Sequence, residues 1–325
     1  MIRHLKFAAV ALGVAPILAG CSMGPAATGS FDRNLDVTNP IRLDVSGTSG
    51  DVTVTGGSEG KVHIHANVRA NGWFFKDAKD SLNEVLSNPP IEQHADSIRV
   101  GKGLSGFRDV SIDYTIQVPN STEVNVSVAS GGVNISNLHG PVKVDSASGS
   151  IRVTNVDGSV RINSASGSTT ASNLGDDLHV SSASGSVSAN SVKGELDVHA
   201  LSGSIDVAKP GSRVQAQTAS GTINVSGAAN DVKAASASGL ISVQGNPSGT
   251  SYWNLKTASG AVDITVPSSS AFYLNADAVS GDIRTSIPVV VEEQGRHSIR
   301  ARAGAGGGRV EIHTISGAIN VKRAS

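Results

Sequence analysis

Apolar and polar residues alternate with a period of two along most of this chain, and the alternation itself recurs every 18 residues between positions 130 and 239. Gly149 to Ser166 (GSIRVTNVDGSVRINSAS) is one such unit. It splits into two nine-residue halves, each with a leading glycine and an apolar–x–apolar pair. Period-two alternation is typical of a β-strand. Each unit therefore predicts two short strands joined by corners, and the fixed period indicates a repeat architecture.

Equivalent positions of successive units form columns of similar residues. Four columns of mostly β-branched residues, which strands favour, begin at Val133, Ile135, Val142 and Val144. A fifth apolar column lies near the corner and reads Ala147, Ala165, Ala183, Leu201, Ala219, Ala237. Counting these corner residues, we expect each unit to bury about six small apolar side chains. The polar residues between the apolar ones are expected to point outward.

These patterns predict an all-β fold, a parallel β-solenoid of the β-helix or β-roll type with 18-residue coils stacked about 4.8 Å apart. One coil alone buries too little to offset the entropy of ordering its backbone, so an array is needed. The crossover rule favours a right-handed coil. Left-handed β-helices also use 18-residue coils, built from hexapeptides, but the nine-residue split argues against that form.

The chain divides into four segments. Residues 1–20 read as a lipoprotein signal peptide and residues 21–34 as a lipidated tether. Residues 35–129 read as N-terminal coils with a helical insert at about 73–88, and residues 130–325 as the regular solenoid with looser C-terminal coils. The last coil, SGAINVKR, is expected to end the stack. Lys322 and Arg323 would place charges at the exposed edge and so disfavour its pairing with another chain.

The helical insert is the one break in the strand pattern. Phe74, Phe75, Ala78, Leu82 and Val85 follow helical spacing, and two prolines end the run. We expect this helix to cap an apolar end or sheet edge. The alternative is an aromatic ligand-binding patch at Trp73 to Phe75.

The N-terminus predicts a membrane anchor. A basic start is followed by an apolar run from Phe7 to Leu18, too short to span a bilayer, and then by Leu-Ala-Gly-Cys21. This closely resembles the lipobox of bacterial lipoproteins, which implies lipid attachment at Cys21, the single cysteine of the chain. The alternative is an ordinary signal peptide with a chance cysteine. Ser22, in the Gram-negative sorting pattern, implies the outer membrane.

Composition limits the possible partners. The formal net charge is −1, and removal of Arg3 and Lys6 with the leader leaves 24 basic and 27 acidic residues, or −3. Nucleic acid is therefore not an expected partner. Aromatic residues make up only 3% of the chain and 37 residues are glycine, which suits a thin core and tight corners.

Several short motifs match known functional signatures but lack the neighbouring residues or elements that those functions require. Gly101 to Gly106 matches G-x-G-x-x-G, but a strand pattern follows where a dinucleotide site needs a helix. Ser58 and Lys61 match S-x-x-K without its partner motifs. His63 and His65 share an outward strand face but lack an evident third metal ligand. The half-repeats lack the aspartates of calcium β-rolls. We expect no metal and no cofactor.

The outward columns supply the candidate surface. Lys143, Asp145, Arg161 and His179 fall on one face of neighbouring coils and form the best cluster for binding. Parallel β-helices also include polysaccharide-degrading enzymes, which need paired carboxylates or a carboxylate–cation cluster. The charges here are mixed and diluted, so we do not expect an enzyme.

Three features carry a family resemblance: YTIQVP at 114–119 followed by TEVNVSVASGGVNI, the SASGSI repeat, and the tail GGGRVEIHTISGAINV. Together they resemble the bacterial "putative adhesin" β-strand repeat family of unknown function, related to autotransporter adhesin head domains, over residues 35–321. The resemblance implies fold more than activity.

The first hypothesis is a non-enzymatic, lipid-anchored cell-envelope protein, adhesin-like or a scaffold, held to the membrane by its N-terminal lipid. Its partner would be a glycan, another envelope protein, or a second copy meeting it at the solenoid ends. The alternative is a carbohydrate-binding or carbohydrate-active β-helix enzyme acting on polysaccharide.

Overall fold

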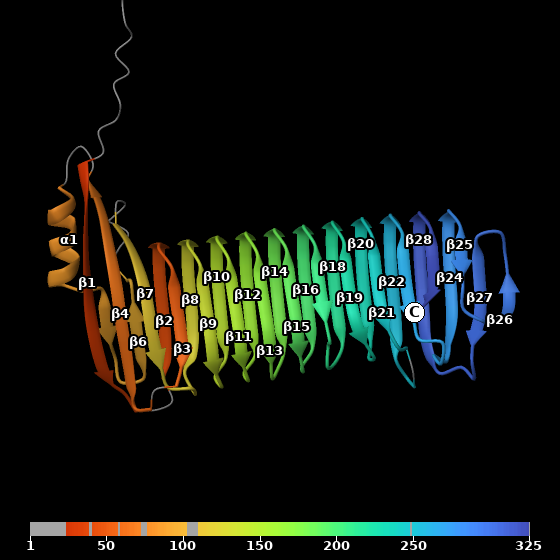
Figure 1. The fold of residues 1–325 in the computed structure, drawn as a ribbon, viewed down its shortest axis with the longest axis horizontal. Coiled ribbons are helices and arrows are strands. Elements are labelled where there is room, and N and C mark those ends of the chain that lie inside the picture. Colours follow the sequence, from red (N-terminus) through yellow and green to blue (C-terminus); the bar gives the residue numbers. More distant parts are fainter. Residues whose placement is uncertain are drawn as a thin grey trace, which may run out of the picture.

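The computed structural model describes residues 24–38, 41–57, 59–72, 77–102, 110–247 and 249–324. Cys21, the aromatic residues at 73–75, Ser58 and positions 103–106 of the glycine motif lie outside the described residues. The chain forms a long stack of strands in two sheets (Figure 1). We call the 14-stranded sheet "sheet A" and the 15-stranded sheet "sheet B".

The regular part of the stack alternates between the two sheets. Its sheet B strands are β8 (Glu123–Ser130), β10 (Val142–Ser148), β12 (Val160–Ser166), β14 (Leu178–Ser184), β16 (Leu196–Ser202), β18 (Val214–Ser220), β20 (Val232–Ser238) and β22 (Tyr252–Ser259). Its sheet A strands are β9 (Val133–Leu138), β11 (Ile151–Val156), β13 (Thr169–Leu174), β15 (Val187–Val192), β17 (Ile205–Ala208), β19 (Ile223–Ala228), β21 (Ile241–Gly245) and β23 (Val262–Val266).

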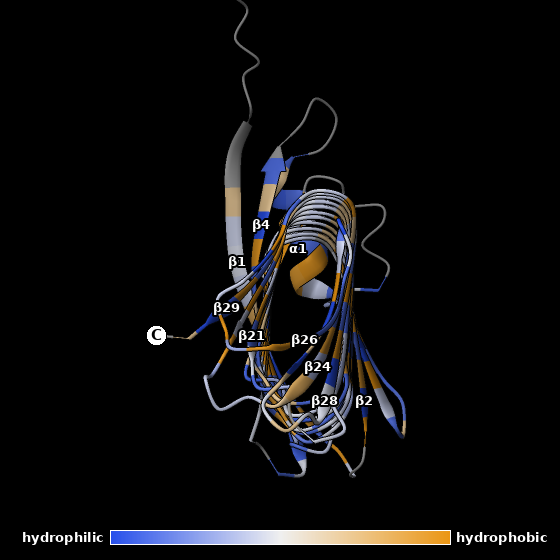
Figure 2. Ribbon diagram, turned by 90° about the vertical axis from the view of Figure 1, so that its right-hand side faces the viewer, coloured by the Kyte–Doolittle hydropathy of each residue, from blue (hydrophilic) through white to orange (hydrophobic). Residues whose placement is uncertain are grey.

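Neighbouring strands of the regular part pair in parallel with a strict register. Val142 lies beside Val160, and Val160 lies beside Leu178, so each residue meets its equivalent in the next 18-residue unit. Seen along the stack, successive coils overlap one behind another (Figure 2). This confirms the parallel solenoid and the 18-residue coil predicted from the repeat.

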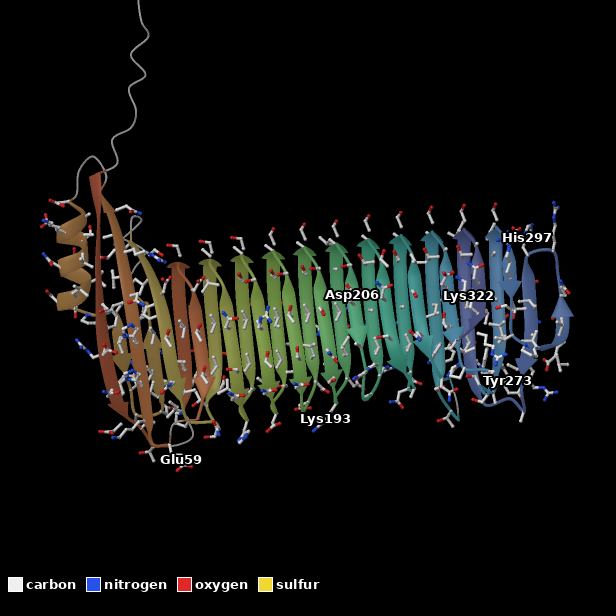
Figure 3. All side chains as sticks on the ribbon, in the orientation of Figure 1. Glu59, Lys193, Asp206, Tyr273, His297 and Lys322 are labelled. Atoms are coloured by element: carbon white, nitrogen blue, oxygen red, sulfur yellow. The ribbon has the colours of Figure 1, made fainter. Side chains whose placement is uncertain are left out.

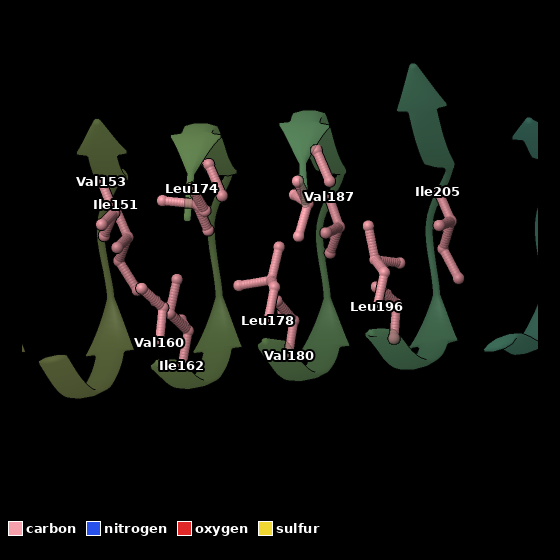
Figure 4. Packing of buried hydrophobic residues seen from close by; sticks show 14 of the residues in the cluster. Ile151, Val153, Val160, Ile162, Leu174, Leu178, Val180, Val187, Leu196 and Ile205 are labelled. Atoms are coloured by element: carbon pink, nitrogen blue, oxygen red, sulfur yellow. The ribbon is translucent and has the colours of Figure 1, made fainter. Parts of the chain in front are cut away.

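The core consists of the four predicted columns plus one more. In the coil formed by β10 and β11, the side chains of Val142, Val144, Ile151, Val153 and Val156 are almost fully buried. Figure 4 shows how these aliphatic side chains from successive coils stack on one another. The polar residues between them face outward, as the alternation predicts.

The fifth column corrects the expectation for the corner. Ala147, Ala165, Ala219 and Ala237 are exposed, and Leu201 is 63% exposed, so this column lies outside the core. The last inward position of each sheet B strand is filled by small, mostly hydroxyl-bearing residues instead: Ser146, Ser164, Ser182, Ala200, Thr218, Ser236. The coil of β10 and β11 therefore buries five apolar side chains, because the alternation of β10 puts Val142, Val144 and Ser146 inward and leaves Ala147 on the outer face.

The geometry of the corners explains why glycine and serine recur every 18 residues. Gly149 has φ +125°, and a Cβ there would lie 2.0 Å from the carbonyl oxygen of Gly131 in the coil below. Only glycine accommodates both conditions. The hydroxyl of Ser146 donates to the carbonyl of Ser148, at 3.2 Å. Ser148 and its equivalents, the last residues of the sheet B strands, lie at these corners.

The opposite corner uses asparagine. Asn137, Asn155 and Asn173 adopt φ between 55° and 60°, the left-handed conformation that asparagine tolerates. The side-chain amide of Asn155 donates to Asn137, and that of Asn173 donates to Asn155, both at 3.1 Å. This amide ladder ties neighbouring coils together.

The N-terminal end differs from the expected simple coils. Residues 24–34, expected to form a tether, belong instead to β1 (Gly24–Asp36), which pairs antiparallel with β4 (Lys61–Gly72). β4 in turn pairs antiparallel with β7 (Val110–Val118). The other elements at this end are β2 (Arg42–Ser49), β3 (Val52–Gly56), β5 (Ile91–Gln93) and β6 (Ser97–Val100).

The predicted helix is present as α1 (Ala78–Ser87) and covers this end of the stack. The carboxylate of Asp77 caps it by accepting from the backbone N–H of Lys79 at 3.0 Å. Leu82 and Leu86 pack over Gly29 of β1, where a Cβ would come within 3.2 Å of both. The expectation that the helix caps the solenoid is confirmed. Among the described residues, no helix is long and apolar enough to cross a membrane.

Coil order departs from chain order at both ends. The coil of β2 and β3 lies between the coil of β6 and β7 and the coil of β8 and β9. At the C-terminus, the strands are β24 (Phe272–Ser280), β25 (Ile283–Thr285), β26 (Val290–Gln294), β27 (Ser298–Ala303), β28 (Gly308–Ser316) and β29 (Ile319–Arg323). Within the described ranges, the strand orders give twelve coils with one strand in each sheet.

The position predicted for the last coil is wrong. β28 and β29 lie between the coil of β22 and β23 and the coil of β24 and β25, so Lys322 does not blunt the end. Its ammonium instead bonds to Asp263 of the neighbouring coil at 2.8 Å. The end is closed by β27, which pairs antiparallel with β24, and by β26, which pairs antiparallel with β27. Both ends of sheet B and the N-terminal end of sheet A thus finish in antiparallel strands, whereas sheet A ends at β25 on the C-terminal side.

Candidate functional site: the outer face of sheet B

The residues predicted to form a surface cluster share the outer face of sheet B but do not make one cluster. Lys143 and Asp145 of β10 form an ion pair at 3.2 Å, and Asn163 donates to Asp145 at 2.7 Å. Arg161 lies between Lys143 and His179 in the parallel register. The imidazole of His179 does not contact this group and instead contacts a residue of the next coil.

That residue is Asp197, which the sequence analysis did not single out. Its carboxylate lies 3.1 Å from Nδ1 of His179 and 3.0 Å from Nε2 of His199, and it accepts from Gln215 at 3.3 Å. The two imidazole rings are 6.2 Å apart. Among the described residues, no group of three or more His, Cys, Asp or Glu side chains could hold a metal ion. The outward columns already placed Asp197 beside His179 and could have identified this pair.

A groove of about 1750 Å³ follows the same face. Its apolar side is the exposed corner column, which continues past the strict repeat into the C-terminal coils. We call this column the "apolar stripe": Ala129, Ala147, Ala165, Ala183, Leu201, Ala219, Ala237, Ala258, Ile315, Val279. It crosses ten strands, from β8 to β24, and therefore extends about 43 Å. Val279 and Ile315, at its C-terminal end, are 73% and 59% exposed.

Two polar rows border the apolar stripe. On one side lies the outward column that includes Asp145, Asn163, His199 and Gln217, all of which line the groove. On the other side lie the exposed corner serines, from Ser148 to Ser280. The face therefore presents a narrow ribbon of methyl groups between two rows of hydrogen-bonding side chains.

The C-terminal end of this face carries two exposed tyrosines. Tyr252 of β22 and Tyr273 of β24 both lie beside Arg309 of β28, which separates them in the sheet. Tyr273 is labelled near the C-terminal end of the stack in Figure 3. The hydroxyl of Tyr252 bonds to the Glu311 carboxylate, and this hydrogen bond raises the pKa of Tyr252. The sequence pattern does not indicate this group, because β28 enters the stack out of chain order. Only the structure brings Arg309 between the two tyrosines.

The two remaining histidines with a predicted surface position lie at the N-terminal end. His63 and His65 of β4 share an outward face, as expected, and both approach Asp32 of β1. The distances from Asp32 Oδ1 are 3.6 Å to His63 Nε2 and 2.9 Å to His65 Nδ1. These contacts tie β1 to β4 across the antiparallel pair.

The architecture defines the chain as a capped parallel β-solenoid with one grooved face. The profile of the Toastrack family, DUF4097, matches residues 42–251 and 215–322, so the chain belongs to this family. This confirms the resemblance to an adhesin-like family of unknown function. No curated protein matches the chain.

Three solved structures are similar to this chain at low identity. A "putative cell adhesion protein" from Clostridium sporogenes ATCC 15579 shares 11% identity, with 92% of this chain and 100% of that chain covered and a TM-score of 0.24. A "putative lipid binding protein" from Parabacteroides distasonis ATCC 8503 shares 12%, with 90% and 96% covered and a TM-score of 0.41. A "putative adhesin" from Bacteroides fragilis NCTC 9343 shares 15%, with 91% and 97% covered and a TM-score of 0.32.

Proposed function

We propose that this protein is a non-catalytic, lipid-anchored scaffold of the cell envelope that binds an extended partner along the outer face of sheet B. The observation that carries the proposal is the apolar stripe. It runs without a break across ten strands, yet it lies outside the core. Exposed apolar surface of this extent usually marks a binding site.

The shape of the groove favours an elongated partner. The groove is lined by equivalent residues of successive coils rather than by the loops of one region. A partner that lies along it would meet the same polar–apolar–polar profile at every coil. A small ligand would find no position distinguished from the next, which supports a polymer over a small molecule.

The anchor is proposed from the lipobox and from where β1 begins. Cys21 precedes the first residue of β1 by three positions, and β1 lies at the end of the stack covered by α1. Lipid at Cys21 would hold this capped end at the membrane. The grooved face would then be displayed along a rod about 58 Å long for twelve coils.

A matched pair of substitutions tests the binding face. Ala165→Glu places a charge in the apolar stripe, and Thr170→Glu places the same charge on the outer face of sheet A in the same coil. Binding of full-length variants to purified cell-wall sacculi is measured by pelleting. We expect Ala165→Glu to weaken binding at least tenfold and Thr170→Glu to leave it within twofold. Equal binding by both variants would contradict the proposal.

The anchor has its own test. Cys21→Ser removes the thiol that would carry the lipid, so the full-length variant should leave the membrane fraction after cell lysis. Its fold, measured by circular dichroism, should not change. Continued membrane retention of Cys21→Ser would mean that the anchor lies elsewhere.

A further inference from the structure

We propose that the partner bound by sheet B is an anionic polysaccharide, an inference that rests on the proposed function and names the chemistry of its ligand. The first step is the pairing of charges on this face. Each carboxylate on the described part of this face between β8 and β24 has a neighbour in contact. Asp145 meets Lys143, Asp197 meets two histidines, Glu311 accepts from Tyr252, Asp277 lies 3.6 Å from His313, and Glu123 meets Arg42. Glu195 lies 4.0 Å from Arg213, and Asp177 and Asp231 accept from the backbone N–H groups of Glu195 and Tyr252.

Four cations on the same face are not paired in this way. Among the described residues, the side chains of Arg161, Lys233, Lys256 and Arg309 have no hydrogen bond or ion pair, and all four are exposed. The carboxylates thus have partners within the protein, whereas these four cations remain available to bind an anionic group of another molecule. These four positions, rather than the face as a whole, are complementary to negative charge on a partner.

The spacing of the cations favours a polymer over a small anion. Arg161 lies on β12 and Arg309 on β28, six strands further along sheet B. At one strand spacing per step, this is about 29 Å. No single phosphate or carboxylate reaches both. An extended chain that carries acidic groups at intervals would meet Arg161 first and then Lys233, Lys256 and Arg309 on three consecutive strands.

The groove profile favours a sugar chain over a polypeptide. A peptide that adds to a sheet bonds to a free strand edge, and the backbone groups of this face are already paired between neighbouring coils. A sugar ring has an apolar C–H face and hydroxyl groups at its edges. The apolar stripe can pack against the C–H face of the ring. The corner serines and the polar column that contains Asn163 and Gln217 can form hydrogen bonds with the hydroxyl groups.

The tyrosines complete the chemistry at the C-terminal end. Tyr252 and Tyr273, 37% and 45% exposed, flank Arg309 on adjacent strands. A tyrosine offers an apolar ring with a polar tip, which suits a sugar ring on its face and a hydroxyl at its edge. An acidic substituent on that sugar would meet the guanidinium between the two rings.

The test measures binding of the full-length chain to polygalacturonate and to its fully methyl-esterified form, which has the same backbone without the charge. Dextran sulfate and dextran form a second pair, which covers acidic groups other than carboxylates. We expect the charged member of at least one pair to bind at least tenfold more tightly than its neutral counterpart. Raising the salt concentration should weaken this binding, since exposed charges are screened.

Variants then locate the site. Each exposed ion pair contributes about a two- to fivefold change in affinity. Arg161→Gln combined with Arg309→Gln should therefore weaken binding to the charged polymer about tenfold. The control is Arg152→Gln, which removes an exposed arginine from the outer face of sheet A and should change affinity less than twofold. Melting curves should show all three substitutions to be neutral for the fold.

Two outcomes would overturn the inference: equal affinity for the charged and neutral members of both pairs, or an Arg152→Gln effect as large as that of the sheet B variants. If neither charged polymer binds while Ala165→Glu still abolishes binding to sacculi, the anionic glycan is wrong and the proposed function stands. If Ala165→Glu also has no effect on sacculi, both fail.

Discussion

The two outer faces of the solenoid are made by the same coils and yet differ sharply. On sheet A the outward columns of the regular part consist almost entirely of serine, threonine and asparagine, with Arg152 and Asp206 among the few charges. On sheet B the equivalent positions carry the charged residues, and a further column carries the apolar stripe. The inward residues of the two sheets are alike in being buried and mostly aliphatic. The inward residues therefore account for the fold without the difference between the outer faces, and the proposed function assigns that difference to a partner on sheet B.

The largest expected effect tests the statement that the inward columns alone maintain the fold. Val153→Asp in sheet A and Val144→Asp in sheet B each place an unpaired charge in a fully buried stack. Each should cost more than about 4 kcal/mol and prevent cooperative folding. Lys143→Asp and Arg152→Asp, at the neighbouring outward positions, should fold and melt normally. A soluble, cooperatively melting Val153→Asp would contradict the inward assignment.

The next effect concerns the corner that joins the faces. Gly203 has φ +125°, and a Cβ there would lie 2.1 Å from the carbonyl oxygen of Gly185. Gly203→Ala should lower the free energy of unfolding by about 3 kcal/mol, since it combines backbone strain with a clash. Urea denaturation would measure it. Ser202→Ala, at the exposed neighbour, should change stability by less than about 0.5 kcal/mol.

A smaller effect separates the apolar stripe from the core. Leu201 is 63% exposed, whereas Leu196 on the same strand is 1% exposed. Leu201→Ser should change stability by less than about 0.5 kcal/mol, and Leu196→Ser should cost about 3 kcal/mol or more. Urea denaturation of both variants checks the comparison. If Leu201→Ser were as costly as Leu196→Ser, the stripe would belong to the core and not to a binding surface.

The smallest effect is a dependence on pH within sheet A. Burial alone would raise the pKa of Asp263, but hydrogen bonds from Lys322 and Asn320 outweigh it and lower the pKa below its ordinary value. A lowered folded-state pKa contributes stability above the unfolded value, near 3.9, which is lost as the pH falls through the folded value. Asp263→Asn should reduce stability at pH 7 by less than about 1 kcal/mol. The difference from the parent should shrink below about pH 4.

The repeat made most of the fold predictable, because a fixed 18-residue period places like residues on like residues. The ends were not predictable in the same way. Nothing in the local pattern of Gly308–Ser316 shows that it enters between two earlier coils, since strands of either order have the same alternation. The segment at 24–34 lacks clear alternation, yet it forms β1 because it pairs along the whole of β4.

The candidate site was predictable in part. The outward columns placed Lys143, Asp145, Arg161 and His179 on one face, as the structure confirms. The apolar stripe was assigned to the interior because its residues are apolar, although the alternation that puts Val142 and Val144 inward already puts Ala147 outward. The Tyr252–Arg309–Tyr273 arrangement depends on the coil order and has no signal in the sequence.

The central claim is that sheet B, and not sheet A, is the face that a partner covers. Because Cys21 is the single cysteine, a cysteine placed in a full-length Cys21→Ser background is the sole thiol. The measurement is the rate of maleimide labelling at Ala165→Cys in the apolar stripe and at Ser188→Cys on sheet A, with and without saturating purified sacculi. We predict that sacculi slow labelling at Ala165→Cys at least tenfold and leave Ser188→Cys unchanged. Equal protection of both positions, or protection of Ser188→Cys alone, would contradict the account.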